Sequence, residues 1–182
     1  MLLFLVGGSG ALTRSSTEAF TDAEWIERAI PGTNPPGFTA WHMARTLDWA
    51  VQCGVRGVAE VASRPAYAAL GVEFGVGIGI APEDAMSIAR RMSRRAVAEY
   101  ADSVTAESLR WLKSADEEEL SRPTDLARNQ AAFPVYRGVG HLEEVHDLLE
   151  IPNWMLILRP ATSHIRVHRG ELEVMAEAFH NS

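Results

Sequence analysis

The sequence predicts an all-α protein, and three observations support that prediction. Apolar residues recur at helical spacing in several long segments. Proline and glycine clusters separate these segments, and none of them shows the alternation of a half-buried strand. The 182 residues are 47% hydrophobic and 23% charged, a balance typical of globular chains. A chain of this length suits one domain, so we expect residues 1–182 to form a single helical domain.

The N-terminal region is expected to contain one long helix and one short helix. Residues 2–19 form the long helix, although each of its three glycines costs roughly 1 kcal/mol in a helix interior. Thr21 begins the short helix, because its hydroxyl and the carboxylate of Glu24 have the spacing of a capping box. The stretch 31–37 holds three prolines and two glycines, so it is not expected to form regular structure.

A second long helix is predicted in the next part of the chain. Thr39 is a suitable N-cap for it, and the helix is expected to run to about Gln52 and to end before Gly54. Residues 54–80 are expected to be mostly a connection, with a short helix near residues 64–70.

Two more long helices are predicted in the second half. Pro82 suits the first turn of one of them, which is expected to run to about Lys113. Residues 114–140 are expected to form a loop. The last helix spans about residues 153–179, and Pro160 should kink or break it.

Charge and composition exclude several classes of function. The net charge of −7 and the pI near 5.4 argue against a nucleic-acid binder, which needs a basic surface for phosphates. The apolar start of the chain lacks a basic region and is cut short by glycines, and no other stretch approaches the ~20 apolar residues of a membrane span. The single cysteine excludes an intrachain disulfide. We therefore expect a cytoplasmic protein that binds neither membrane nor nucleic acid.

Two histidines near the C-terminus have the spacing of metal ligands. His164 and His168 are four residues apart, which leaves the two rings about 40° apart on one face of a helix. Two imidazole nitrogens so placed can bind one ion at ~2.1 Å. Glu171 lies on the same stripe, one turn further along. The pair alone favours a metal site only modestly over a polar patch on the helix. It also lacks the glutamate of a His-Glu-x-x-His motif, so a third ligand is required.

His42 is the best candidate for that third ligand. It lies at the start of an apolar helix, beside Trp41, where a histidine without a partner would be costly. A hydrogen-bonded core histidine is the alternative interpretation. His141 and His146 are five residues apart and point in different directions on any helix, so we assign both to the surface, with His146 as a remote fourth ligand.

Other chemically suggestive residues are expected to be structural. Asp48 lies ~240° around the helix from His42 and does not share its face. Cys53 is interpreted as a buried structural thiol. The stretch 75–79 lacks the spacing of a nucleotide-binding loop and is expected to be a flexible connection. The arginines at positions 90, 91, 94 and 95 are interpreted as a solvated face or, less directly, as an attractor of anionic substrates.

An ordered set of segments resembles the DinB-like superfamily of four-helix-bundle metalloenzymes. The resemblance covers roughly residues 20–175. It rests on the residues Pro31-Gly32-Thr33-Asn34-Pro35, Trp41-His42-Met43-Ala44-Arg45 with Asp48-Trp49, Leu70-Gly71 with Gly75-Val76-Gly77, Ala115 to Leu120 with Arg122-Pro123, and His164-Ile165-Arg166-Val167-His168-Arg169-Gly170-Glu171-Leu172. The family pattern usually has glutamine where this chain has Glu171.

The resemblance implies a specific fold and site. The fold would be an up-down-down-up four-helix bundle, and His42, His164 and His168 would hold one divalent metal ion. Relatives with known activity include mycothiol-dependent maleylpyruvate isomerase and bacillithiol transferases, and dimers are common among them. A small-molecule substrate, a low-molecular-weight thiol and a homodimer are therefore expected.

The predicted site supports three competing functions. Three neutral imidazoles suit zinc, nickel or iron, and such an ion lowers the pKa of a bound thiol or water. The first hypothesis is thus a thiol-dependent transferase or isomerase, in which Glu171 orients a histidine ring or acts as a base. The second is a hydrolase with an activated water. The third is a module that binds a metal or a small ligand without catalysis.

Overall fold

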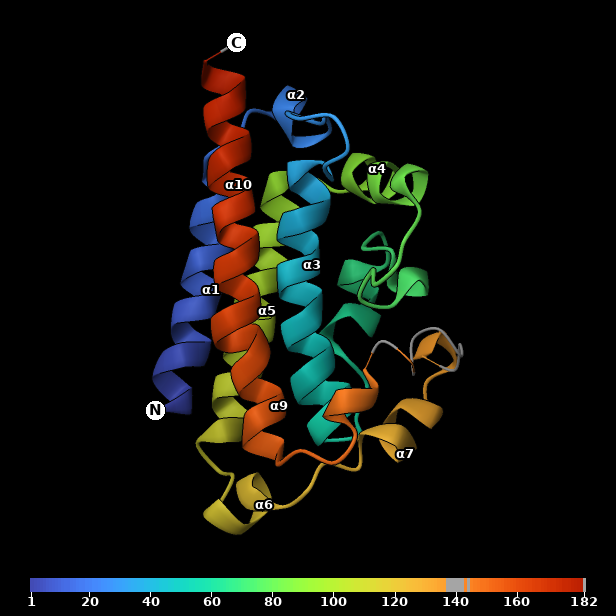
Figure 1. The fold of residues 1–182 in the computed structure, drawn as a ribbon. Coiled ribbons are helices and arrows are strands. Elements are labelled where there is room, and N and C mark those ends of the chain that lie inside the picture. Colours follow the sequence, from blue (N-terminus) through green and yellow to red (C-terminus); the bar gives the residue numbers. More distant parts are fainter. Residues whose placement is uncertain (137–142, 144, 182) are drawn as a thin grey trace.

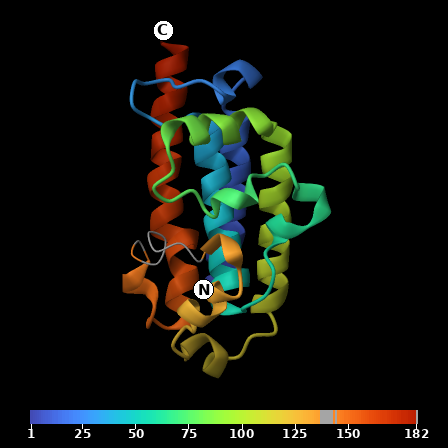
Figure 2. The same ribbon diagram turned by 90° about the vertical axis from the view of Figure 1, so that its right-hand side faces the viewer.

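The fold is described by a computed structural model that covers residues 1–136, 143 and 145–181, and within these ranges it has helices and no strand. Long helices lie side by side, and the two termini lie at opposite ends of the molecule (Figures 1 and 2). Shorter helices and turns cover one side and both ends. No helix in the described ranges combines the length and the apolar character needed to cross a bilayer.

Three long helices are α1 (Leu2–Glu18), α3 (Pro36–Asp48) and α5 (Arg94–Leu112). A π-helical turn, Trp49–Val55, extends α3. The fourth long segment joins α9 (Asn153–Arg159), a π-helical turn (Pro160–His164) and α10 (Ile165–His180). The shorter helices are α2 (Asp22–Trp25), α4 (Pro82–Arg91), α6 (Glu117–Ser121) and α7 (Leu126–Ala131). Short 3₁₀ turns occupy Val61–Ser63, Pro65–Tyr67, Val72–Phe74, Pro134–Tyr136 and His146–Leu148.

Gly10 of α1 serves the packing of this helix against α5. A Cβ atom added to Gly10 would lie 2.2 Å from the hydroxyl oxygen of Thr105 on α5. The absence of a side chain therefore lets the two helices approach closely, and this contact offsets the low helix propensity of glycine. The predicted helix over residues 2–19 is confirmed, as is the capping box that begins α2.

The boundaries predicted for α3 were wrong at both ends. The helix begins at Pro36, since proline fits the first helical turn, and Thr39 lies buried inside it. At the other end the chain stays helical through Gly54, where an added Cβ would lie 2.8 Å from a methyl group of Leu156. That glycine allows close packing against α9, and it does not end the helix.

The single helix predicted from Pro82 to Lys113 is divided in two. Met92 adopts an extended backbone conformation, and the hydroxyl of Ser93 caps the new helix by accepting from the amide of Ala96 at 3.1 Å. The carbonyl of Met92 then accepts the indole N–H of Trp25 at 2.8 Å. A tertiary contact thus stabilises the break, and only the capping serine signals it in the sequence.

The remaining differences lie in the second half of the chain. The predicted loop 114–140 contains α6 and α7, and the Asp116 carboxylate caps α6 through the amide of Glu119 at 2.7 Å; residues 137–140 lie outside the described ranges. Pro160 was expected to kink or break the last helix. The regular α-helix does end directly before it, at Arg159, and the π-helical turn that starts at the proline then leads into α10.

A candidate metal centre between α3 and α10

Three histidines from two distant parts of the chain meet beside α3. His42 comes from α3, His164 ends the π-helical turn, and His168 lies one turn further on α10. One ring nitrogen from each lies within 4.8 Å of the other two, and the Nε2 atoms of His42 and His164 are 3.0 Å apart. The structure therefore brings together all three histidines that the sequence singled out.

Hydrogen bonds fix the orientation of two of the rings. His42 Nδ1 donates to the carbonyl of Val76, so its Nε2 carries a lone pair that faces the other histidines. His168 Nδ1 lies 2.7 Å from the Glu171 carboxylate, which accepts its proton, so the neutral form of His168 has its lone pair on Nε2. Glu171 therefore occupies the position expected of a residue that orients a metal ligand.

The loop around Val76 was wrongly predicted to be only a flexible connection. Gly77 has a φ of +83°, and a Cβ atom there would lie 2.8 Å from the ring of Trp41. The loop can therefore lie directly against α3, where its Val76 carbonyl meets His42. Sequence reasoning missed this backbone acceptor, and the alternating glycines were the only signal of such close approach.

Burial keeps two of the imidazoles neutral. It lowers the pKa of His42 to about 4, with a smaller contribution from the charge of His168. The pKa of His164 is lowered to about 2, mainly by burial and to a smaller extent by the charges of His42, His168 and Arg159. Neutral imidazole is the form that binds a metal ion, so both groups are ready ligands at neutral pH. In addition, Nδ1 of His164 is buried and has no hydrogen-bond partner among the described residues.

The three histidines line a cavity of about 250 Å³. Most of its wall is apolar. The other lining residues are Thr46, Trp49, Val76, Ile78, Val145, Leu148, Leu156, Arg159 and Pro160.

Comparison with known proteins identifies the family. A family model described as the DinB superfamily matches residues 8–146, which is more than half of the chain. The chain belongs to the DinB superfamily. No curated protein and no solved structure matches it. The matched residues include His42 and end before His164, so the convergence of the three histidines is an observation of the structure, independent of the family match.

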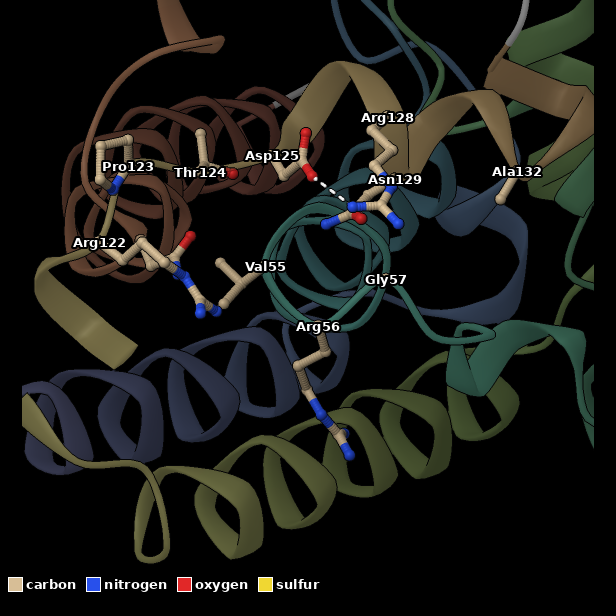
Figure 3. A pocket seen from close by; sticks show the side chains of 11 residues that line it. Val55, Arg56, Gly57, Arg122, Pro123, Thr124, Asp125, Arg128, Asn129 and Ala132 are labelled. Atoms are coloured by element: carbon tan, nitrogen blue, oxygen red, sulfur yellow. Dashed lines mark hydrogen bonds and ion pairs between the residues drawn. The ribbon is translucent and has the colours of Figure 1, made fainter. Parts of the chain in front are cut away.

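A larger cavity of this DinB superfamily protein lies elsewhere. It measures about 740 Å³ and is lined by the end of the π-helical turn Trp49–Val55 and by α7 (Figure 3). Several of its polar groups serve the chain itself, because the side chains of Thr124 and Asn129 both donate to the carbonyl of Gly54 and Asp125 pairs with Arg128. The smaller cavity at the histidines is the better candidate for a functional site, since three possible metal ligands meet there.

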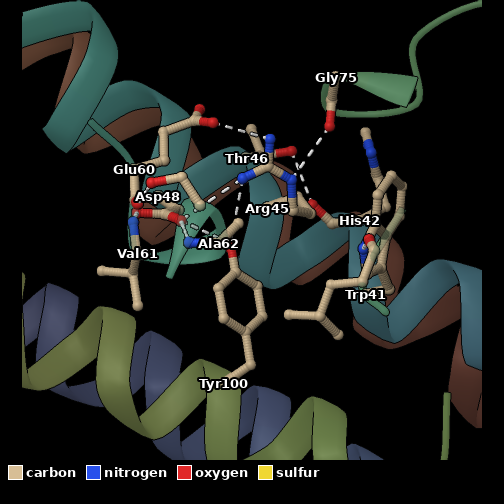
Figure 4. Close-up of polar contacts among 12 residues, drawn as sticks. Trp41, His42, Arg45, Thr46, Asp48, Glu60, Val61, Ala62, Gly75 and Tyr100 are labelled. Carbon is tan, nitrogen blue, oxygen red and sulfur yellow. Dashed lines mark hydrogen bonds and ion pairs between the residues drawn. The ribbon is translucent and has the colours of Figure 1, made fainter. Parts of the chain in front are cut away.

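A second polar cluster lies one turn from His42 on α3 (Figure 4). Arg45 is completely buried and contacts both Asp48 and Glu60. Two tyrosine hydroxyls, of Tyr100 and Tyr136, accept from the same guanidinium group. Sequence reasoning assigned Asp48 a structural role but missed this network, although an arginine on an apolar helix face was a signal for it.

The remaining candidate residues lie apart from the histidines. Cys53 is fully buried, as predicted, and burial raises the pKa of its thiol. His146 is exposed, as predicted, and it is not part of the histidine cluster. Arg95 pairs with Glu99, four residues further along α5, at 3.2 Å. His141 lies outside the described residues.

Proposed function

We propose that His42, His164 and His168 bind one divalent transition-metal ion, and that the protein is a thiol-dependent transferase or isomerase. One observation carries the metal site. One ring nitrogen of each histidine lies within 4.8 Å of the other two, and the lone pair on Nε2 of His42 lies 3.0 Å from Nε2 of His164. Three neutral imidazoles that meet at one point form a ligand set that divalent transition metals take in proteins.

The donor set fits a catalytic ion. Three imidazoles without a carboxylate suit zinc, nickel or iron, and they leave coordination positions free for a ligand from solution. When bound, the ion lowers the pKa of a coordinated thiol or water. The side chain of His168 is 21% exposed, which supports access from solvent.

The protein residues prepare the site for this chemistry. The carbonyl of Val76 and the carboxylate of Glu171 hold the rings of His42 and His168 in the tautomer that presents Nε2. Much of the cavity wall is apolar, and beside an apolar wall charge interactions are stronger than in bulk water.

The proposal includes the up-down-down-up bundle of this family. The course of the chain in Figure 1 supports it, because α1 and α10 ascend in that view whereas α3 and α5 descend. Contacts of α1 with both α5 and α10 are consistent with this arrangement.

Elemental analysis tests the metal site. We expect close to one equivalent of zinc, nickel or iron in the purified protein and a loss of most of it in His168→Ala. His146→Ala is the matched control, since it removes an exposed histidine that lies outside the cluster. Equal metal content in the wild type and His168→Ala would overturn the ligand assignment.

A conjugation assay tests the proposed activity. The metal-loaded protein is incubated with a chlorodinitrobenzene electrophile and cysteine, glutathione, bacillithiol or mycothiol in turn. We expect one thiol to give conjugation that His168→Ala lacks. Metal-dependent hydrolysis of ester substrates without any thiol reaction would instead favour a hydrolase.

A further inference from the structure

The cavity at the histidines combines an apolar wall with a single charged side chain. Apolar side chains from four separate segments form the wall: Trp49, Ile78, Val145, Leu148 and Leu156. Among the described lining residues only Arg159 carries a permanent charge. The hydroxyl of Thr46, another polar lining group, already donates to the carbonyl of His42 at 2.8 Å.

Arg159 differs from most arginines of this protein. The majority of them pair with a carboxylate, as Arg45 does with Glu60 and Arg169 with Glu173. In the part of the chain that the structure describes, the guanidinium group of Arg159 has neither an ion pair nor a hydrogen bond. An arginine at the edge of an apolar cavity presents five donors in a planar fork, a geometry that matches a carboxylate.

We infer that Arg159 selects the substrate by pairing with its carboxylate, and that the substrate is a small acid with an apolar body. The inference rests on the proposed metal centre, which would take the reacting end of the same molecule. The cavity volume of 250 Å³ corresponds to roughly eight waters at about 30 Å³ each, so the part of the substrate that enters is small.

Charge balance in the cavity supports an anionic ligand. The three histidines are neutral ligands, so neither they nor the apolar wall offsets the charge of a bound cation, and the charge of Arg159, an exposed residue, is offset by solvent alone. Glu171, the carboxylate nearest to the ligands, is engaged with His168 and does not line the cavity. An acid that enters supplies the missing negative charge, and its hydrogen bonds to Arg159 are of the strong, charge-assisted kind.

Two thiols of the same length can distinguish recognition of a carboxylate by Arg159 from binding of a thiol to the metal. Mercaptobutyrate and mercaptobutanol share a thiol that can bind the metal, and only the first carries a carboxylate. Each is titrated into the cobalt-loaded protein, and binding is followed by the thiolate-to-cobalt absorption band. We expect the wild type to bind the acid about tenfold more tightly than the alcohol, the size of effect typical of a charge-assisted hydrogen bond.

Substitutions of Arg159 decide the inference. Arg159→Gln should bind the acid and the alcohol about equally, and its affinity for the alcohol should match that of the wild type. Arg159→Lys should retain part of the preference for the acid. Arg166→Gln is the matched control, because it removes a positive charge from an exposed position on α10 that does not line the cavity. Cobalt-loaded protein that binds both thiols equally, or that keeps the preference in Arg159→Gln, would overturn the inference alone. Cobalt-loaded protein that binds neither thiol would overturn the inference together with the proposed thiol-dependent activity. Failure to bind cobalt would overturn the metal site and the inference together.

Discussion

Two polar clusters lie one turn apart on α3, and they differ in how completely their hydrogen bonds are satisfied. Around Arg45, all five N–H donors have geometrically matched acceptors: the Gly75 carbonyl, two carboxylates and two tyrosine hydroxyls. Around His42, ring nitrogens face one another and Nδ1 of His164 has no partner among the described residues. A closed network holds the fold together, whereas an open one indicates where a ligand from outside completes the structure.

The charged groups of the network around Arg45 stabilise one another. Asp48 accepts from Arg45, from Tyr100 and from the amides of Val61 and Ala62. Burial raises the pKa of Asp48 to about 6, which still leaves it ionised at neutral pH and paired with the guanidinium. The network thereby fastens the segment after α3 to the bundle, and that segment leads into the loop that orients His42.

The largest expected effect on stability follows from removing Arg45 from its buried network. Arg45→Met leaves the carboxylates of Asp48 and Glu60 buried without a cation, which should cost about 3–5 kcal/mol of unfolding free energy. Urea denaturation measures the change. Arg166→Met, at an exposed position, should stay within about 0.5 kcal/mol of the wild type. A wild-type midpoint for Arg45→Met would mean that the network contributes nothing to stability.

Metal should stabilise the protein through the three histidines, His42, His164 and His168. Zinc or nickel at a hundredfold excess over its dissociation constant should stabilise the metal-free protein by about 2.7 kcal/mol. His164→Ala should fold and show no such increment in thermal denaturation. Equal stabilisation of both proteins would show that the ion binds elsewhere.

A smaller effect is expected from the residue that orients His168. Glu171→Gln should weaken metal binding by about 10- to 100-fold, because its amide is a poorer acceptor for the ring N–H. Competition with a chelator measures the affinity. Glu173→Gln is the control, since Glu173 pairs with Arg169 and does not touch the histidines. If both variants bind metal alike, Glu171 does not support the site.

The smallest effect concerns acid stability without metal. Unfolded histidine takes up a proton near pH 6.5, whereas folded His164 does so only near pH 2. Between these values the unfolded state binds the extra proton, so stability falls as the pH is lowered below 6.5. From pH 7 to 4 the wild type should lose roughly 1–2 kcal/mol more than His164→Gln, after a discount for partial exposure. The opposite contribution of Asp48 is present in both proteins and cancels. A parallel loss in both would contradict the lowered pKa.

Sequence reasoning found the side chains of the candidate site and missed their supports. The four-residue spacing of His164 and His168 already required one helix face, and His42 was the histidine on an apolar helix. The carbonyl of Val76 carries no sequence signal, because any residue has a carbonyl. The break at Met92 likewise depends on the indole of Trp25, 67 residues away. Local patterns specify local structure, and such contacts are formed only after the helices pack.

The sequence by itself determined that the chain is helical, which residues could bind a metal, and that the stretch 31–37 contains a turn. Periodicity, capping residues and side-chain chemistry are properties of neighbouring residues, so they can be read along the chain. The tertiary structure decided that three histidines from distant segments meet, that Arg159 shares their cavity, and that Arg45 is satisfied where His164 is not. Whether a polar group finds a partner depends on which helices pack together, and that is settled by the burial of the whole core.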